Sequence, residues 1–392
     1  MRLSELGYVP DDSRFDAQRL ARKVIKACRY IPEAWGEDVE AVVWEVHRRH
    51  CPGGGDFEDG SGSQFSGDGD GEERVSGVID RCLELLYGDS DDKAEALEGV
   101  LNLCIEGSRN LEIVVRHHQL MSALSRLLSE DAAGSAEVCF GIGRVFLALS
   151  NFTEFHPDLS NYRVGSLIVD VLHLETRRAQ RPREVEEGGA GGAEDKGRTA
   201  PRRRRHDQVV RICLSVLANL ADDGEVQRKM LKKGMLGILS SCLDRRSVPC
   251  TITSLLILGK TSVFEETVAD LSAEGCDVIP KLVHMIGSSN DDVIQSSLRV
   301  LYNLSFNRKC RSGMLESDAL PKLFVLLRKS PLRGKTLRLL YHLSVDKRCR
   351  KRMRNEDFLS ILMQLIIKFP RNHLAKELAA VAINVSFVPG LF

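Results

Sequence analysis

The chain has 392 residues, of which 43% are apolar, and its 55 lysines and arginines are balanced by 55 acidic residues. This balance removes the electrostatic argument for a nucleic-acid or membrane-surface partner, and without an uninterrupted apolar run of about 18 residues we expect no membrane insertion. Eleven cysteines, no C-x-x-C pair and no secretory leader favour a reducing, cytoplasmic compartment.

The first 75 residues divide into two parts. Residues 1–50 contain two short amphipathic helical patterns separated by Pro32, with Leu20, Val24 and Cys28 on one face of the first. Residues 51–75 are dominated by glycine, serine and acidic side chains. Such a segment cannot bury enough apolar surface to offset the entropy lost on ordering, so we predict a disordered linker after a short helical segment.

Residues 76–392 carry an internal repeat. The segment Val300–Ser305 has counterparts at Leu339–Ser344 and Val216–Ala221. We call the position of Asn303 in this phrase the ladder position. The spacings from Asn219 (303 minus 219 is 84) and to His342 (342 minus 303 is 39) give a period of about 41 residues, which is the range of armadillo and HEAT repeats. The full set of ladder positions is Asn102, Ala148, Asn219, Lys260, Asn303, His342 and Asn384.

Each unit is predicted to contain three helices. In residues 307–344 a short helix begins at Arg308, a second begins near Asp318, and Pro331 opens a third that ends near Ser344. Three helices per repeat predict an all-α fold, a right-handed armadillo-type superhelical solenoid. Met230, Met314 and Met353, each eleven residues after a ladder position, are predicted to fill gaps in the core. An Arg/Gly-rich stretch at about 177–206 is predicted to be a disordered insertion within the array.

A basic and amide-bearing stripe is the candidate binding site. Residues four and eight before the ladder position share its face of the third helix. The stripe consists of Arg144, Arg211, Asn219, Lys260, Arg299, Asn303, Arg338, His342, Lys376 and Asn384. One interpretation is a solvated charged surface. The other is a groove for an extended acidic peptide, with asparagines bonding its backbone and arginines its carboxylates.

Other clusters gave weaker signals. Cys310 and Cys349 hold equivalent places in two repeats, and we interpret them as structural thiols rather than metal ligands because no further ligands have suitable spacing. The run Arg202–Arg205 fits either a solvated charge cluster or a nuclear-localisation or nucleic-acid patch. Since no nucleotide-binding, nucleophile-elbow or zinc-protease motif is present, we expect no enzymatic activity and no cofactor or metal.

Several phrases resemble one particular family. The strings are Leu298–Phe306, Leu320–Leu323, Leu340–Asp346, Asn110–Ile113 and Phe152–His156. Together they resemble the kinesin-associated protein family, the armadillo accessory subunit of heterotrimeric kinesin-II, over about residues 15–390. The resemblance implies a non-catalytic adaptor that binds the tails of two motor chains and links them to cargo adaptor proteins. It also implies a cytoskeletal and ciliary location and a part in microtubule-based and intraflagellar transport.

Two further expectations qualify this resemblance. The same stripe also suits a general armadillo peptide-binding scaffold of the β-catenin type for an acidic extended partner, and only the family phrases favour the motor subunit. The chain ends at Phe392 on an apolar run, without the polar terminal cap that a solenoid needs. We therefore expect a fragment that lacks its C-terminal repeats and self-associates through an open end.

Overall fold

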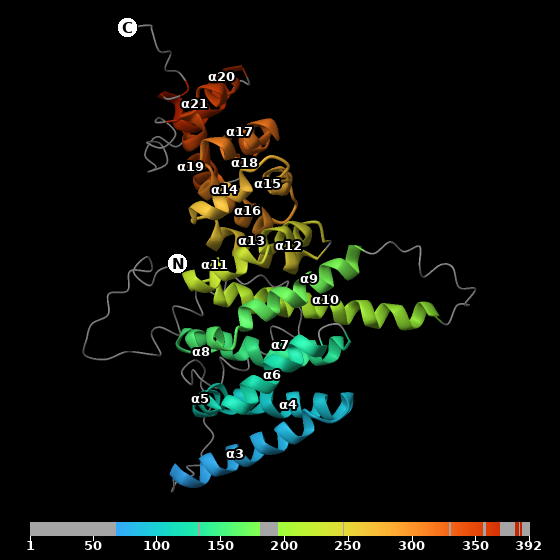
Figure 1. Ribbon diagram of the computed structural model, residues 1–392. Coiled ribbons are helices and arrows are strands. Elements are labelled where there is room, and N and C mark those ends of the chain that lie inside the picture. Colours follow the sequence, from blue (N-terminus) through green and yellow to red (C-terminus); the bar gives the residue numbers. More distant parts are fainter. Residues whose placement is uncertain are drawn as a thin grey trace. The chain divides into compact units, whose positions relative to one another are not determined.

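A computed structural model describes residues 68–131, 134–180, 195–245, 247–328, 331–355, 358–368, 381–383 and 385 (Figure 1). In these residues the regular elements are helices, without a strand, which confirms the predicted all-α class. The predicted segment 1–50 and the stripe residues Lys376 and Asn384 lie outside the described residues. The chain forms two compact units, Met1–Ile238 and Leu239–Phe392.

The first unit stacks three-helix repeats. Its helices are α3 (Asp68–Leu85), α4 (Ser90–Glu106), α5 (Ser108–Arg116), α6 (His118–Asp131), α7 (Ala136–Ser150), η2 (Thr153–Phe155), α8 (His156–Asn161), α9 (Val164–Gln180), α10 (Asp195–Leu220) and α11 (Gly224–Lys232). Helices α4, α7 and α10 are third helices of successive repeats, and α7 packs against both α4 and α10. Helix α12 (Met235–Leu243) contains the boundary between the units.

The second unit repeats the same order. Its helices are α13 (Val248–Thr261), α14 (Glu265–Leu271), α15 (Val278–Met285), α16 (Asp291–Leu304), α17 (Arg308–Glu316), α18 (Ala319–Leu326), α19 (Arg333–Ser344), α20 (Lys347–Asn355) and α21 (Phe358–Lys368). The third helix α16 packs against α13 and α19. The predicted three-helix unit is therefore confirmed as α17, α18 and α19. Helix α19 begins at Arg333 rather than Pro331, because Pro331 lies in the turn before it.

Short polar side chains fix where several helices begin. Asn290 Oδ1 accepts hydrogen bonds from the backbone N–H groups of Asp292 and Val293, at 2.9 and 3.1 Å, at the start of α16. Asn307 does the same at the start of α17 and Asp223 at the start of α11. These contacts pair N–H groups that the first turn of a helix leaves without an internal acceptor, so the sequence determines these boundaries locally.

The third helices form the centre of each repeat. In α16 the buried apolar residues are Val293, Ile294, Leu298, Val300, Leu301 and Leu304. Three of the first helices contribute a methionine to the core: Met230, Met314 and Met353 are fully buried in α11, α17 and α20, which confirms their predicted place. Since each repeat buries its apolar residues against the next, the array is held together by contacts between neighbours.

Two predicted boundaries were wrong. Helix α3 begins at Asp68, inside the predicted linker 51–75. In the predicted insertion 177–206, α9 continues to Gln180 and α10 begins at Asp195. The basic run is thus helical, and Arg205 is held by Glu137 Oε1 at 2.8 Å and by the Phe140 ring at 4.4 Å.

Among the described helices, no single one combines the length and apolar content needed to cross a membrane. Helix α7 and the segment Thr153–Asn161 satisfy length and composition only as a pair, and they are bent by 109°.

Candidate functional site

The eight described residues of the predicted stripe all lie on third helices. The first unit holds Arg144 on α7 and Arg211 and Asn219 on α10. The second unit holds Lys260 on α13, Arg299 and Asn303 on α16, and Arg338 and His342 on α19. The structure therefore gives two separate groups, one in each unit.

The ladder asparagines connect one repeat to the preceding one. Asn219 Nδ2 donates to Ser150 Oγ at 3.1 Å and to Asn151 Oδ1 at 3.0 Å. Asn303 Nδ2 donates to Ser262 Oγ at 2.9 Å and to the Gly259 carbonyl at 3.0 Å. An amide has only two N–H donors, so both are engaged between the repeats in each case. The predicted bonding of these asparagines to a peptide backbone stays a prediction.

His342 fills the same position with an imidazole. A hydrogen bond of 2.8 Å joins His342 Nδ1 and Ser305 Oγ. Because the Ser305 hydroxyl already donates to the Tyr302 carbonyl at 2.6 Å, the imidazole nitrogen is the donor. Burial lowers the pKa of His342, and the positive charge of Arg311 lowers it further. The ring is therefore held neutral, which suits a single N–H donor facing a hydroxyl.

These contacts lie at the same register position in each repeat. We call each of them a ladder junction. The acceptors Ser150, Ser262 and Ser305 are buried and each come two residues after a ladder position. Each serine donates to the carbonyl three residues earlier and accepts from the ladder residue of the next repeat. Sequence reasoning missed these serines, although the repeated Asn-Leu-Ser phrase contained the signal.

The first helices add a second fixed contact. Arg311 Nη1 donates to the carbonyls of Ser305 and Phe306 at 2.8 and 3.1 Å. Arg350 Nη1 donates to the carbonyls of Ser344 and Val345 at 3.1 and 2.9 Å. In the first unit, His156 and Gln227 occupy the same place, eight residues after a ladder position, and bond the carbonyls of Ser150 and Ala221. These side chains pair carbonyls that a helix end leaves without an internal donor.

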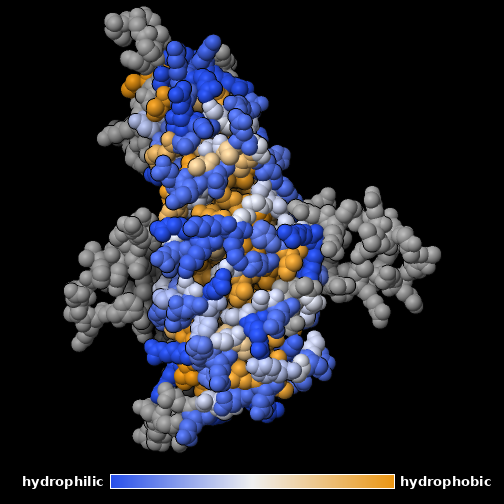
Figure 2. Space-filling model, in the orientation of Figure 1, coloured by the Kyte–Doolittle hydropathy of each residue, from blue (hydrophilic) through white to orange (hydrophobic). Residues whose placement is uncertain are grey.

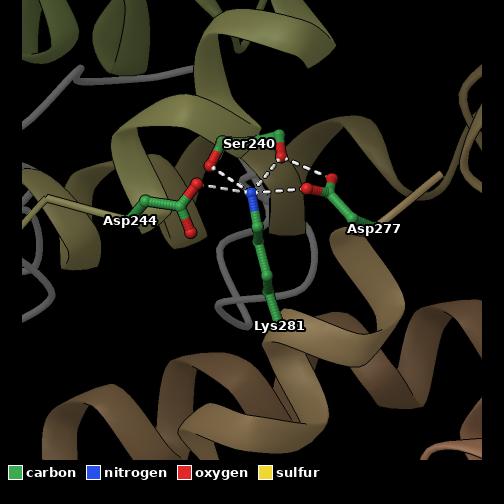
Figure 3. A network of polar contacts seen from close by, with 4 residues as sticks. All are labelled: Ser240, Asp244, Asp277 and Lys281. Carbon is green, nitrogen blue, oxygen red and sulfur yellow. Dashed lines mark hydrogen bonds and ion pairs between the residues drawn. The ribbon is translucent and has the colours of Figure 1, made fainter. Parts of the chain in front are cut away.

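The lysines of the repeated Pro-Lys-Leu phrase join the second helices. Lys281 Nζ lies 2.6 Å from Asp244 Oδ2, 2.7 Å from Asp277 Oδ2 and 2.8 Å from Ser240 Oγ (Figure 3). Burial lowers the pKa of Lys281, but hydrogen bonds to Asp244 and Asp277 outweigh this effect and raise it. Its counterpart Lys322 donates to the Val283 carbonyl at 2.9 Å. Both lysines are therefore structural.

In the first unit, one stripe arginine is paired with an acidic side chain and the other is half-buried. Arg144 Nη1 lies 2.6 Å from Glu98 Oε2 on α4. Arg211 is half-buried, and its Nε is buried with no hydrogen-bond partner among the described residues. Because Glu98 neutralises Arg144, the first unit offers a weaker positive surface at the stripe than the sequence suggested.

In the second unit the stripe arginines are exposed. Arg299 and Arg338 occupy the same register position on the packed helices α16 and α19 and are both exposed. Lys335 lies nearby and bonds Gln295 Oε1 at 2.6 Å. Burial of its ammonium group, and then the positive charge of Arg299, lower the pKa of Lys335. Arg299 therefore places a second positive charge close to Lys335.

An aromatic cluster accompanies these arginines. The His342 ring lies 4.8 Å from the Tyr302 ring and 4.3 Å from the Phe306 ring, and Tyr341 is 6.1 Å away. Phe306 is 67% exposed and Tyr341 44% exposed. Val263 and Val345, at the register position of Phe306, are 68% and 58% exposed. Exposed aromatic and arginine side chains are typical of binding hot spots, and sequence reasoning missed this cluster.

Cys310 and Cys349, together with the adjacent histidines His117 and His118, have structural roles. Burial raises the pKa of both Cys310 and Cys349 to about 11, so flanking arginines do not activate them. His117 Nδ1 accepts the Leu120 N–H at 3.2 Å, and the His118 ring packs edge-on against Tyr162. Among the residues with described side chains, none form a cluster that fits a metal ion.

The solved structures similar to this chain include designed and engineered proteins. A designed armadillo repeat protein in complex with the peptide (KR)4 has a TM-score of 0.51 at 17% identity, covering 68% of this chain and 99% of its own. A computationally designed armadillo repeat protein for modular peptide recognition gives 0.53 at 17% identity, covering 67% and 99%. An engineered protein gives 0.53 at 15% identity, covering 95% and 94%. The fold and the ladder junctions thus define an armadillo-repeat protein.

The sequence identifies the family to which this armadillo-repeat protein belongs. Residues 10–388 match the family described as kinesin-associated protein (KAP), so the chain belongs to the kinesin-associated protein family. This confirms the resemblance inferred from the repeat phrases. Proteins of this family and fold are typically non-catalytic adaptors.

Proposed function

We propose that the chain is the adaptor subunit of a heterotrimeric kinesin motor. In this role it binds the tails of the two motor chains and links them to cargo adaptor proteins in microtubule-based and intraflagellar transport. Its place of action is the cytoplasm, on the cytoskeleton and in the cilium. Family membership supports the kinesin association, and the second unit supplies a surface suited to peptide capture.

One observation supports the proposed location of the binding site. On the neighbouring helices α16 and α19, exposed Arg299 and Arg338 each precede an aromatic residue, Tyr302 or Tyr341, by three positions. Residues three apart share a helix face, so each repeat presents one cation and one ring side by side. Arginine can form two parallel hydrogen bonds with a carboxylate, while the rings supply apolar area at low entropic cost. The surface therefore suits an extended acidic segment with apolar anchors.

The test is a titration of the full chain with the tails of the two motor chains. The variant R299E/R338E is expected to bind at least about tenfold more weakly. Its control is R81E/R116E, which reverses two arginines on α3 and α5 whose side chains are 76% and 73% exposed. Unchanged affinity of R299E/R338E, or an equal loss in the control, contradicts the proposed site. Selective binding of an acidic junctional peptide instead of the tails favours the β-catenin-like alternative.

A further inference from the structure

A second charged surface lies on the first helices of the same unit. Helices α17 and α20 are neighbours: the Arg348 side chain bonds Ser312 Oγ, and Arg352 bonds the Leu315 carbonyl at 3.3 Å and the Asp318 carboxylate. Their outer faces therefore form one continuous surface. We call it the basic edge; its exposed residues are Arg308, Lys309, Lys347, Arg348 and Lys351. Figure 2 shows strongly hydrophilic side chains gathered over this end of the unit.

Part of the positive charge on these helices has a structural use. Arg311 and Arg350 bond the ends of α16 and α19. Arg352 pairs with Asp318, and Arg354 Nε donates to the Val385 carbonyl at 2.6 Å. These four arginines do not need a partner outside the chain.

Arg348 bonds Ser312, but the other four cations of the basic edge have no such use. No described residue accepts a hydrogen bond or ion pair from the side chains of Arg308, Lys309, Lys347 and Lys351. Lys347 and Lys351 are four residues apart on one helix, a spacing at which like charges repel. Lys347 also lies in the first turn of α20, where a positive charge opposes the helix dipole. The charges therefore disfavour the helix that carries them.

The fold does not require positive charge at this place. Helix α14 is the first helix of the repeat that precedes α17, and its charged residues Glu265, Glu266 and Asp270 are all acidic. Helix α20 has six basic residues and no acidic one. Since a first helix accepts either sign, folding does not determine the sign of the α20 charges that make no structural contact, and an external partner can account for it.

We propose that the basic edge is a docking site for a short acidic segment of a partner protein, separate from the stripe on the third helices. The Arg348 and Arg352 side chains bridge α17 and α20, and nine helical residues span about 13 Å, so about five extended peptide residues cover the edge. Charge complementarity identifies the occupant: clustered carboxylates meet cations that lack partners within the described residues.

Two other anionic partners fit this surface less well. The exposed face of α20 offers no aromatic side chain for stacking on bases, which single-stranded nucleic acids favour. Its apolar residues, Cys349 and Met353, are buried in the core, so α20 has no apolar face to insert into a membrane.

The experiment uses the full chain and a fluorescein-labelled peptide of six glutamates flanked by glycine and serine, followed by fluorescence anisotropy. The unsubstituted chain is expected to bind saturably, and more weakly as salt increases. K347E/K351E is expected to lose at least about tenfold in affinity. The neutral variant K347Q/K351Q is expected to fall between the two. Its circular dichroism should match that of the unsubstituted chain, and its unfolding midpoint should be no lower, because these lysines make no described contact and their charges disfavour α20.

The matched control is K229E/K232E, which makes the same charge change on two exposed lysines of the first helix α11. It should bind within about twofold of the unsubstituted chain, because it alters net charge but not the edge. R299E/R338E should also retain peptide binding, so failure of this proposal can be told apart from failure of the motor-tail site. Absence of saturable binding, or equal losses in K229E/K232E and K347E/K351E, overturns the proposal. So does tighter capture of single-stranded RNA or phosphatidylserine vesicles through Lys347 and Lys351.

Discussion

The ladder junctions and the basic edge use polar residues in opposite ways. At the junctions, Asn219, Asn303 and His342 each bond a serine of the preceding repeat, and the arrangement occurs in both units. At the basic edge, Lys347 and Lys351 make no such contact, and the equivalent helix α14 is acidic. Polar residues whose contacts to the preceding repeat recur in register therefore hold the repeats together, whereas charged residues that make no such contact are available for partners.

The largest expected effect comes from removing a junction. Asn303→Ala leaves Ser262 Oγ and the Gly259 carbonyl without the donor that now pairs with them. Leaving buried polar groups unpaired costs about 1–3 kcal/mol, so the free energy of unfolding should fall by that amount in urea denaturation. The variant Asn219→Ala is the parallel test in the first unit. If the free energy of unfolding falls by less than about 0.5 kcal/mol in both variants, the asparagines contribute no more than ordinary surface residues.

A smaller loss is expected at the helix-end contact. Arg350→Met keeps much of the apolar stem but removes the bonds to the carbonyls of Ser344 and Val345. Hydrogen bonds of this kind contribute about 1–2 kcal/mol, and the unfolding midpoint should shift accordingly. Arg350→Lys, which retains a donor, should recover part of the stability. Equal stability of the Met variant and the unsubstituted chain would assign Arg350 to the partner surface instead.

The smallest effect is a pH dependence at His342. Its pKa in the folded chain is lowered by burial and then by Arg311, whereas an unfolded histidine titrates near about 6.5. The unfolded state therefore binds the proton more readily, so stability is complete above about pH 6.5 and declines as the pH falls towards the lowered pKa. His342→Asn supplies the residue found at other ladder positions. Urea unfolding at several pH values should show the decline in the unsubstituted chain and a flatter profile in this variant.

The sequence predicted the parts of this fold that depend on local pattern. The period of the ladder phrase located the third helices, and the methionines marked the first helices correctly, because helical spacing and burial repeat with the unit. The partners of the ladder residues were not predicted. Asn303 and His342 bond serines 41 and 37 residues away, and the packing of successive helices determines such contacts.

The candidate site was predicted in part for the same reason. Register placed Arg299 and Arg338 on one face of the third helices, and the structure leaves both exposed. The sequence register did not reveal that Glu98 pairs with Arg144 across 46 residues. Nor did it reveal that Phe306 and Tyr341 are exposed beside His342. The basic run of α20 was visible in the sequence, but its structural arginines could be separated from Lys347 and Lys351 only once their contacts were known.

The most direct test compares motor-tail affinity in two variants of the same helix α16. Asn303→Ala removes a ladder residue, and Arg299→Glu reverses an exposed cation one turn earlier. The account predicts that, with both chains folded, Arg299→Glu weakens binding of the tails while Asn303→Ala lowers stability and leaves the affinity close to that of the unsubstituted chain. If Asn303→Ala abolishes tail binding at full stability while Arg299→Glu has no effect, the division between junction and binding residues is wrong.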